Sequence, residues 1–487
     1  MDEFEEAGAP SLNEKLRTGR PRRADPGVPS APEGAVLQPT ERPTRSPRAL
    51  SMFASSLGLI GGKVATMGLG FLFWILAARV FAPAEVGLAT GALSAVMLCT
   101  QIALLGAGSA VIVHFPRHRA SPAHLLDAAF TVVIASALVA ALLFLVLAFG
   151  IFHELRVVAS DPAFSISFLA IGVLGTAGLL LDHMSAALRR GDQALTRALL
   201  FGIITIGLLG GVVLATDQRG AFIIYATWVG GSLAACLLGA VQLRRSLTGY
   251  RYRPRFQRRL IRSLLGVGLP NHALTLAERA PALILPIVVV ELVSPEANAA
   301  WYAAWMMAWL LYFIPVQVGM TIFAEAAHRV GELGQLVRHG IRTSLLLGLP
   351  AGAGLALAAE FALSILGPTY ADEGATPLRI LVIAVVPLTL IQAYFIVCRS
   401  TQRLREATMT GIANGLAGVG GAAIAATTFG LTGIALAWLL AQFVTAAWSV
   451  ARLTSLASKL DEVPRAPLVT RQLRDVAYYV TPPSSNT

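Results

Sequence analysis

Charged residues are scarce in this chain, since Asp, Glu, Lys and Arg make up only 13% of its 487 residues. A soluble domain carries about 25%. Hydrophobic residues reach 55%, and the mean hydropathy is +0.68. This composition excludes an ordinary soluble globule and predicts a polytopic membrane protein. Cysteine is also rare, and Cys99, Cys236 and Cys398 all fall within apolar segments. We therefore expect small core residues there, and neither a disulfide framework nor a metal site.

Catalytic motifs are missing as well. The sequence contains no phosphate-cradling GxxxxGK[ST], no HExxH, no GxSxG and no Cys/His ligand cluster. We expect no cofactor and no ATP hydrolysis in this chain. The longest loop predicted on the outer side, "GPTYADEGATP", leaves little room for an enzyme site. A transporter is favoured over a membrane glycosyltransferase or polymerase, while a scaffolding membrane protein stays open as an alternative.

Long apolar segments account for most of the chain. A helix needs about 20 apolar residues to cross a membrane, and twelve segments approach or exceed that length. The sequence therefore predicts one all-α membrane domain of twelve transmembrane helices. The segments are approximately residues 51–80, 84–114, 123–152, 163–187, 194–216, 220–243, 263–290, 297–325, 341–366, 378–398, 406–428 and 432–451.

The basic residues predict the orientation of these helices. If the N-terminus is inside, 32 of the 38 Lys and Arg residues lie in inner loops and tails, which fits an N-in, C-in topology. The run "RRSLTGYRYRPRFQRRLIR", residues 244–262, then joins two six-helix halves on the inner side. Nucleic-acid binding is one interpretation of this run. We favour a loop that faces anionic lipids, so no nucleic-acid partner is predicted.

The two halves resemble each other. "ARVFAPAEVGLATGALSAVML" and "VELVSPEANAAWYAAWMMAWL" align at an offset of 212, with Pro83 matching Pro295 in a short outer turn. We predict two parallel six-helix repeats, residues 49–245 and 263–455, around a central cavity. The remaining parts are a disordered cytoplasmic tail at 1–48, which has no apolar signal region, a basic cytoplasmic linker at 246–262 and a cytoplasmic C-terminal tail at 456–487.

Two adjacent charges interrupt the seventh predicted helix. Glu278 and Arg279 lie near its midpoint in "TLAERAPALILP", where each ion costs about 2.5–3.5 kcal/mol on an insertion scale. A polar cavity or an interhelical ion pair would offset that cost. At 3.6 residues per turn, His272 and Arg279 share one helix face, and Asn271, Thr275 and Glu278 share the adjacent face.

Lys63 occupies the equivalent place in the first predicted helix, within "LGLIGGKVATMGLG". If both helices face the cavity, Lys63 and Arg279 make it positive and Glu278 neutralises only part of that charge. Such a cavity suits an anion, for instance a diphosphate. We predict Lys63, Arg279, His272 and Asn271 as substrate-binding residues. A buried Lys63–Glu278 pair that only locks the halves together is an alternative, and a lone His272 is more typical of a satisfied polar residue. Arg399 and Asp182 lie near inner helix ends, where an interfacial position is expected first.

Several motifs resemble the polysaccharide-type flippases of the multidrug/oligosaccharidyl-lipid/polysaccharide exporter superfamily. The first is "AARVFAPAEVGLAT", and the second is the acidic–Arg pair with its following Pro and Tyr in "AERAPALILPIVVVELVSPEANAAWYAA". The others are "GPTYADEGATPLRIL" and "TFGLTGIALAWLLAQ". Their order and spacing cover residues of about 50–455. The chain departs from the family pattern in carrying Glu278 where Asp is usual.

This resemblance implies transport of polyprenyl-diphosphate-linked oligosaccharides from the inner to the outer leaflet of the bacterial plasma membrane. The expected partners are that lipid-linked glycan, membrane lipids, and a polysaccharide polymerase or glycosyltransferases. Members of the family are thought to use an ion gradient, so Glu278 becomes the candidate ion-coupling residue, with His272 as a second choice. A multidrug or cation antiporter of the same fold is the alternative, and it would require a net acidic cavity.

Overall fold

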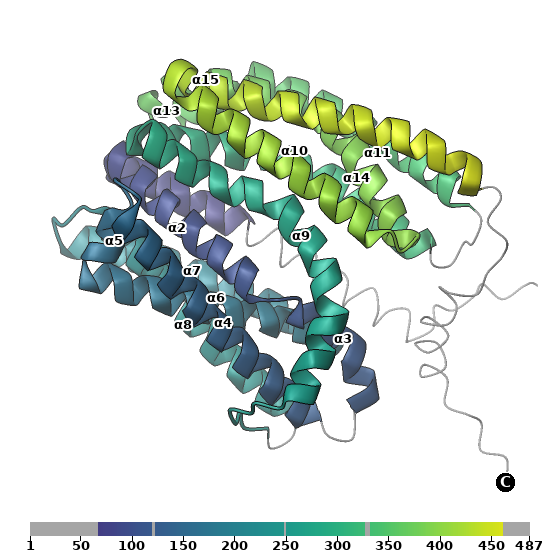
Figure 1. Ribbon diagram of the computed structural model, residues 1–487. Coiled ribbons are helices and arrows are strands. Elements are labelled where there is room, and N and C mark those ends of the chain that lie inside the picture. Colours follow the sequence, from purple (N-terminus) through teal and green to yellow (C-terminus); the bar gives the residue numbers. More distant parts are fainter. Residues whose placement is uncertain (1–66, 119–121, 248–249, 327–331, 461–487) are drawn as a thin grey trace, which may run out of the picture. The chain divides into compact units, whose positions relative to one another are not determined.

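The computed structural model describes residues 67–118, 122–247, 250–326 and 332–460, all within one compact unit, Ser51–Thr487 (Figure 1). These residues form helices and contain no strand. The helices are Met67–Val80, α2 (Pro83–Ala103), α3 (Ala107–His114), the short 3-10 helix η1 (Phe115–His118), α4 (Pro122–Gly150), α5 (Arg156–Ser160), α6 (Pro162–Ala187), α7 (Gly191–Ala215), α8 (Ala221–Ser246), α9 (Arg258–Leu292), α10 (Pro295–Ala326), α11 (Leu333–Leu357), α12 (Ala359–Ser364), α13 (Pro368–Ile383), α14 (Val385–Ser400) and α15 (Leu404–Leu460).

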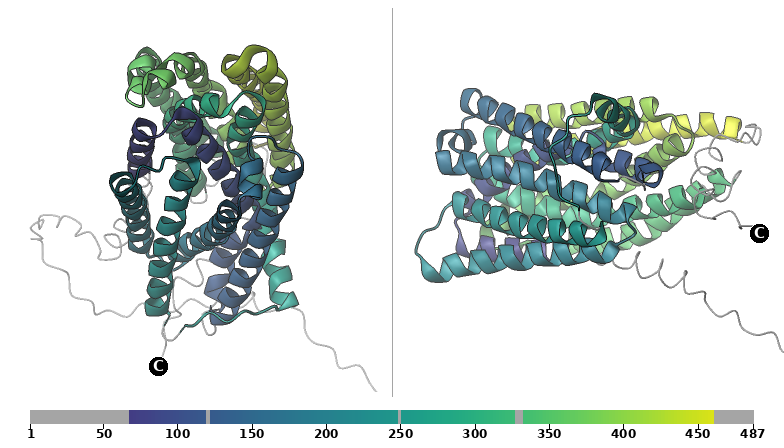
Figure 2. Two further views of the ribbon diagram at one scale, coloured as in Figure 1. Left: turned by 90° about the vertical axis from the view of Figure 1, so that its left-hand side faces the viewer. Right: turned by 90° about the horizontal axis from the view of Figure 1, so that it is seen from below.

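Membrane-spanning length is common among these helices. Within the described ranges, nine helices are long and apolar enough to cross a membrane, with α2 and α3 counted as one. The number is ten if α13 and α14, which meet at a bend of 43°, form one span. The shorter apolar helix Met67–Val80 lies ahead of them. The long helices run roughly parallel to one another (Figure 2). The predicted all-α, multi-pass membrane architecture is therefore confirmed, whereas the count of twelve spans and the N-in, C-in orientation stay predictions.

Two of the helical segments are broken at glycine. The predicted span 84–114 is divided between α2 and α3 at Gly106, whose φ is +77°. The long helix α15 contains Gly430 at φ +54°, so it consists of two helices joined at a kink. Only glycine adopts this left-handed backbone at no steric cost. The break at Gly430 separates the predicted spans 406–428 and 432–451.

The two ends of the bundle differ in how the halves pack. We call the end where α2 and α10 begin the Pro83 end, and the opposite end, where α9 begins, the Arg258 end. At the Pro83 end one hydrophobic core includes residues of both halves, among them Phe73, Ile224, Trp301 and Trp438. At the Arg258 end the cores are separate. One is built from α3, α4, α6 and α8 together with Leu264, and two others from α9 to α15.

The helix α9 connects these two arrangements. Its first turns pack on the first half, where Gly268 lies so close to Gly106 that neither position has room for a Cβ atom. Its later turns pack on α15, where Ala277 lies against Gly411 and Pro281 lies against Gly415. Figure 1 shows α9 running from beside α3 to beside α10. Three prolines inside α9, Pro270, Pro281 and Pro286, each remove a backbone hydrogen bond and favour bending of this helix.

Candidate functional site

Glu278 is paired across the second half of the protein. It projects from α9, and its Oε2 accepts a hydrogen bond from Nη2 of Arg399 on α14 at 2.7 Å. Their side chains are only 15% and 18% exposed. The second oxygen, Oε1, is buried and accepts no hydrogen bond from any residue that the structure describes. The pairing offsets part of the cost of burying each ion, and the net charge of the pair is zero.

Arg279 differs from its neighbour in being exposed. It forms no hydrogen bond and no ion pair with another residue of the described ranges. Because Glu278 is neutralised by Arg399, the group Glu278–Arg279–Arg399 carries a net charge of +1. Among the described residues the cation that pairs with Glu278 is Arg399. Lys63 lies outside the described residues.

The polar residues one and two turns before Arg279 have different environments. Asn271 and Thr275 are half-buried, and the Thr275 hydroxyl donates to the Asn271 carbonyl oxygen at 3.1 Å. His272 is buried, and its Nε2 lies 2.8 Å from the carbonyl oxygen of Gln101 on α2. His272 thus makes an interhelical contact, which is the satisfied polar role that the sequence also allowed. On α9, Asn271 is thus half-buried and Arg279 is exposed.

Sequence reasoning missed the role of Arg399. It sits near the end of the tenth predicted span, and such a position ordinarily indicates a side chain at the membrane interface. Its partner lies 121 residues earlier in the chain. No spacing within the sequence marks α14 as the neighbour of α9. The only available signal was the isolated Glu278 itself, which requires a cation somewhere in the fold.

Contacts between the halves close the Pro83 end. Asn298 on α10 is fully buried, and its Nδ2 donates to the Gly87 carbonyl oxygen at 2.8 Å and to Thr90 Oγ1 at 2.9 Å. A Cβ atom on Gly87 would overlap the carbonyl group of Pro295. Gly87 also approaches Ala299, its equivalent at the repeat offset of 212. The first turns of α2 and α10, whose prolines Pro83 and Pro295 align at the offset of 212 in the sequence, therefore meet.

Two charged side chains add polar contacts between the halves at the same end. The carboxylate of Glu291, in the last turn of α9, accepts hydrogen bonds from three consecutive backbone N–H groups at residues 153–155, at 2.7, 3.3 and 2.8 Å. Arg79 donates to the carbonyl oxygens of Ile365 at 2.7 Å and Ser364 at 3.2 Å. Charge-assisted hydrogen bonds of this kind are stronger than neutral ones. They hold the first half against the second where the shared core lies.

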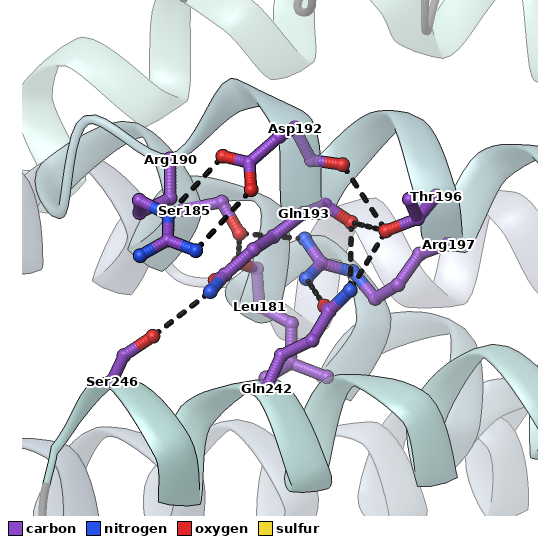
Figure 3. A network of polar contacts seen from close by, with 9 residues as sticks. All are labelled: Leu181, Ser185, Arg190, Asp192, Gln193, Thr196, Arg197, Gln242 and Ser246. Atoms are coloured by element: carbon purple, nitrogen blue, oxygen red, sulfur yellow. Dashed lines mark hydrogen bonds and ion pairs between the residues drawn. The ribbon is translucent and has the colours of Figure 1, made fainter.

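A third polar group lies within the first half. Arg197 on α7 is 5% exposed and donates to Gln242 Oε1 at 2.6 Å, Asp182 Oδ1 at 2.7 Å and Ser185 Oγ at 2.8 Å. Figure 3 shows the guanidinium enclosed by side chains of α6, α7 and α8. Asp182 is more than an interfacial charge, because it neutralises this buried arginine. The network joins three helices of one half and has no free charge to offer a ligand.

Solved structures share this fold. An inward-facing multidrug resistance MATE family transporter of the MOP superfamily is 16% identical at a TM-score of 0.61, over 82% of this chain and 99% of that one. An outward-facing MATE family transporter is 15% identical at 0.61, over 86% and 98%. A MOP superfamily transporter from Pyrococcus furiosus, described as having a binding pocket of reverse polarity, is 15% identical at 0.58, over 84% and 96%. No curated protein matches the sequence.

These likenesses and the helix arrangement define a multi-pass membrane protein with the fold of the MOP superfamily transporters. A match to a family model identifies the family of this chain. The model of the polysaccharide biosynthesis protein family matches residues 53–327, which is more than half of the sequence. The chain belongs to that family, as the resemblance of its sequence motifs indicated.

Proposed function

We propose that this protein is a flippase, and not an enzyme. It moves a polyprenyl-diphosphate-linked oligosaccharide from the inner to the outer leaflet of the bacterial plasma membrane for surface polysaccharide biosynthesis. Family membership and the transporter fold support this class of function. The observation that carries the choice of substrate is Arg279, which stays exposed and without an anionic partner among the described residues while Glu278 is neutralised by Arg399.

The chemistry of Arg279 suits the diphosphate group of such a lipid. A guanidinium remains charged, and it binds phosphate oxygens through two parallel N–H donors. A diphosphate brings negative charge to a group of residues whose net charge is +1. The half-buried Asn271, two turns before Arg279, carries a side-chain amide that would donate a further hydrogen bond to a phosphate or sugar oxygen. Lys63 is our predicted second cation for the same ligand.

The arrangement of the cores supports transport by alternating access. The halves share one core and several polar contacts at the Pro83 end, and their cores are separate at the Arg258 end. By the positive-inside rule, the basic residues of the loops favour a cytoplasmic location for the Arg258 end. We infer a state that is closed toward the outside and that receives its cargo from the inner leaflet.

Glu278 is our candidate for coupling to an ion gradient. Its Oε1 is buried without a donor from the described residues, while Oε2 holds Arg399. Protonation of the carboxylate would remove the charge that binds Arg399, and α9 and α14 would then be joined less tightly. Glu278→Gln mimics the protonated form. Gradient-dependent transport that persists unchanged in this variant would contradict the role.

A drug or cation antiporter of the same fold is the second candidate, because the solved structures named above include multidrug transporters. Such a protein would be expected to present net negative charge to its substrate. The charge of the group around Glu278 is positive, so the described site favours an anionic cargo. The antiporter would be favoured if the protein exports cationic dyes, and if substitution of Glu278 stops this export whereas substitution of Arg279 does not change it.

Deletion of the gene in its host tests the proposal. A flippase deficiency should leave lipid-linked glycan accumulated on the cytoplasmic leaflet, and the wild-type gene should clear it. The variant Arg279→Gln should fail to clear it. Arg338→Gln, which changes an exposed arginine of α11 outside the site, should behave like wild type. Normal glycan export in the deletion strain would contradict the function. Capture of a polymerase or glycosyltransferase by the tagged protein would test the predicted partners.

A further inference from the structure

The segment that joins the two halves is a dense array of arginines. From the end of α8 to the first turns of α9 the chain carries eight arginines, and seven of them are exposed. None forms an ion pair with a carboxylate of the described residues. The eight are Arg244, Arg245, Arg251, Arg253, Arg255, Arg258, Arg259 and Arg262. An uncompensated array of this size attracts phosphate groups.

This segment is held on α4 by specific hydrogen bonds. Asp127 is 3% exposed, and its Oδ1 accepts from the Tyr250 hydroxyl at 3.0 Å and from the Arg253 backbone N–H at 3.1 Å. Thr131 Oγ1 accepts from the Arg255 backbone N–H at 3.0 Å and lies 3.1 Å from the Tyr252 hydroxyl. The anchoring contacts use backbone N–H groups and tyrosine hydroxyls. The guanidinium groups are therefore left available for other partners.

An apolar cleft begins where the anchored segment passes into α9. Its volume is about 520 Å³. Residues about one turn apart on a single face of α9 line it, together with the preceding Phe256. A Cβ atom added to Gly266 would meet no atom of the described residues within 4 Å, which agrees with an opening at this point. The lining residues are Phe256, Arg258, Ile261, Arg262, Leu265, Gly266 and Leu269.

We propose that this cleft is a capture site for the polyprenyl-diphosphate cargo at the cytoplasmic end of the protein. Arg258 and Arg262 stand one helical turn apart, about 6 Å along the axis, and would each bind one phosphate of the diphosphate. The apolar wall from Phe256 to Leu269 would hold the first isoprene units. The inference rests on the proposed flippase function and adds a loading step to it.

The position of the cleft on α9 supports cargo over other anions. Arg262 and Arg279 belong to the same helix, about 25 Å apart along its axis, so a lipid captured at the cleft lies at the start of a path toward the candidate site. Nucleic acid is bound through polar contacts to its phosphate backbone and through stacking on its bases. The apolar wall of the cleft supplies neither kind of contact. A free phosphate would not use the wall either.

The test is binding of farnesyl diphosphate to the full chain in nanodiscs of phosphatidylcholine. Arg258→Gln/Arg262→Gln should weaken binding at least about tenfold, since two charge-assisted contacts are lost. Gly266→Trp, which fills the cleft, should weaken it similarly without changing any charge. Arg338→Gln/Arg342→Gln is the matched control, because these exposed arginines of α11 have the same spacing. Gly334→Trp controls for the bulky substitution, since a Cβ atom there also meets nothing. Both controls should bind like wild type.

The outcomes separate the capture site from the function. Wild-type affinity and wild-type translocation in both cleft variants would overturn the capture site and leave the flippase intact. Competition is a further test. If an equal amount of phosphatidylglycerol abolishes the binding of farnesyl diphosphate, the capture site is also overturned, because the cleft would then bind any anionic lipid. If wild-type protein neither binds farnesyl diphosphate nor moves a lipid-linked glycan, the proposed function itself fails. Equal binding of farnesol and farnesyl diphosphate would remove the role of the two arginines.

Discussion

Glu278 on α9 and Arg399 on α14 form an ion pair in which Oε2 and Nη2 lie 2.7 Å apart. The adjacent Arg279 has no such partner among the described residues and is exposed. One arginine of the group therefore joins α9 to α14, and we propose that the other binds the ligand. This division of roles separates the structural part of the site from the part that we propose binds the cargo.

Breaking the ion pair from either side should destabilise the protein. Removal of one partner leaves a buried, uncompensated charge, which costs about 3 kcal/mol. We therefore expect Arg399→Gln to lower the melting temperature of the purified protein, because Glu278 is left buried without its partner. In Glu278→Gln/Arg399→Gln neither charge remains, so part of the loss should be recovered. Melting temperatures of the two single variants and the double variant check this. Additive losses in the double variant would show that the two side chains do not interact.

The close contact at Gly87 should not tolerate a larger residue. The atom that a Cβ would meet belongs to the backbone of Pro295, which cannot rotate away as a side chain would. Gly87→Ala should therefore cost about 1–3 kcal/mol, as overpacked cores do, and should loosen the Pro83 end. Gly210→Ala on α7 is the control, because its Cβ would enter open space. Thermal unfolding compares the two variants, and equal behaviour would contradict the tight contact.

Locking the Pro83 end should stop transport. Thr90 and Asn298 are hydrogen-bonded between the halves at 2.9 Å, so Thr90→Cys/Asn298→Cys places two thiols in reach of a short bifunctional thiol reagent. The background requires Cys99, Cys236 and Cys398 to be replaced by Ala. We expect cross-linking to abolish translocation of lipid-linked glycan, and cleavage of a reducible cross-link to restore it. Translocation at the full rate in cross-linked protein would contradict alternating access through this end.

The anchor of the basic segment should be sensitive to alkaline pH. Burial, followed by the negative charge of Asp127, raises the pKa of Tyr250 well above its ordinary value. A raised folded-state pKa means that the contribution of Tyr250 is complete below about pH 10 and is lost as the pH rises further toward the folded-state pKa. At pH 8 the wild type should be more stable than Tyr250→Phe by about 1 kcal/mol. Melting curves at pH 8 and pH 11 test this, and a difference that stays constant would contradict it.

The sequence predicted the elements of the fold well because long apolar runs have few other uses. Most predicted segments coincide with helices, and Pro83 and Pro295 begin α2 and α10 at the predicted repeat offset. The predicted helix boundaries were less accurate where a helix extends beyond the apolar run in the sequence. The helix α9 begins at Arg258 instead of about residue 263, since arginine is a good helix former even though it ends the apolar run.

The candidate site was only partly predictable. The cost of a charge in an apolar span identified Glu278 and Arg279, because that cost depends on the sequence alone. The identity of the partner depends on which helices are neighbours, so Arg399 was taken for an interfacial residue. His272 illustrates the same limit, since its partner is a backbone carbonyl of α2 that no sequence pattern reveals. The break at Gly106 also went unpredicted, because the apolar run continues through it.

The most direct test of the proposed function is the rate at which purified protein moves a fluorescent polyprenyl-diphosphate oligosaccharide across proteoliposomes, measured for wild type, Arg279→Lys and Arg279→Gln. We predict a loss of at least about tenfold for Arg279→Gln, since a charge-assisted contact with the diphosphate is removed. Arg279→Lys should be intermediate, because it keeps the charge but not the paired donors. Translocation by Arg279→Gln at the wild-type rate, in protein that melts at the wild-type temperature, would contradict the account.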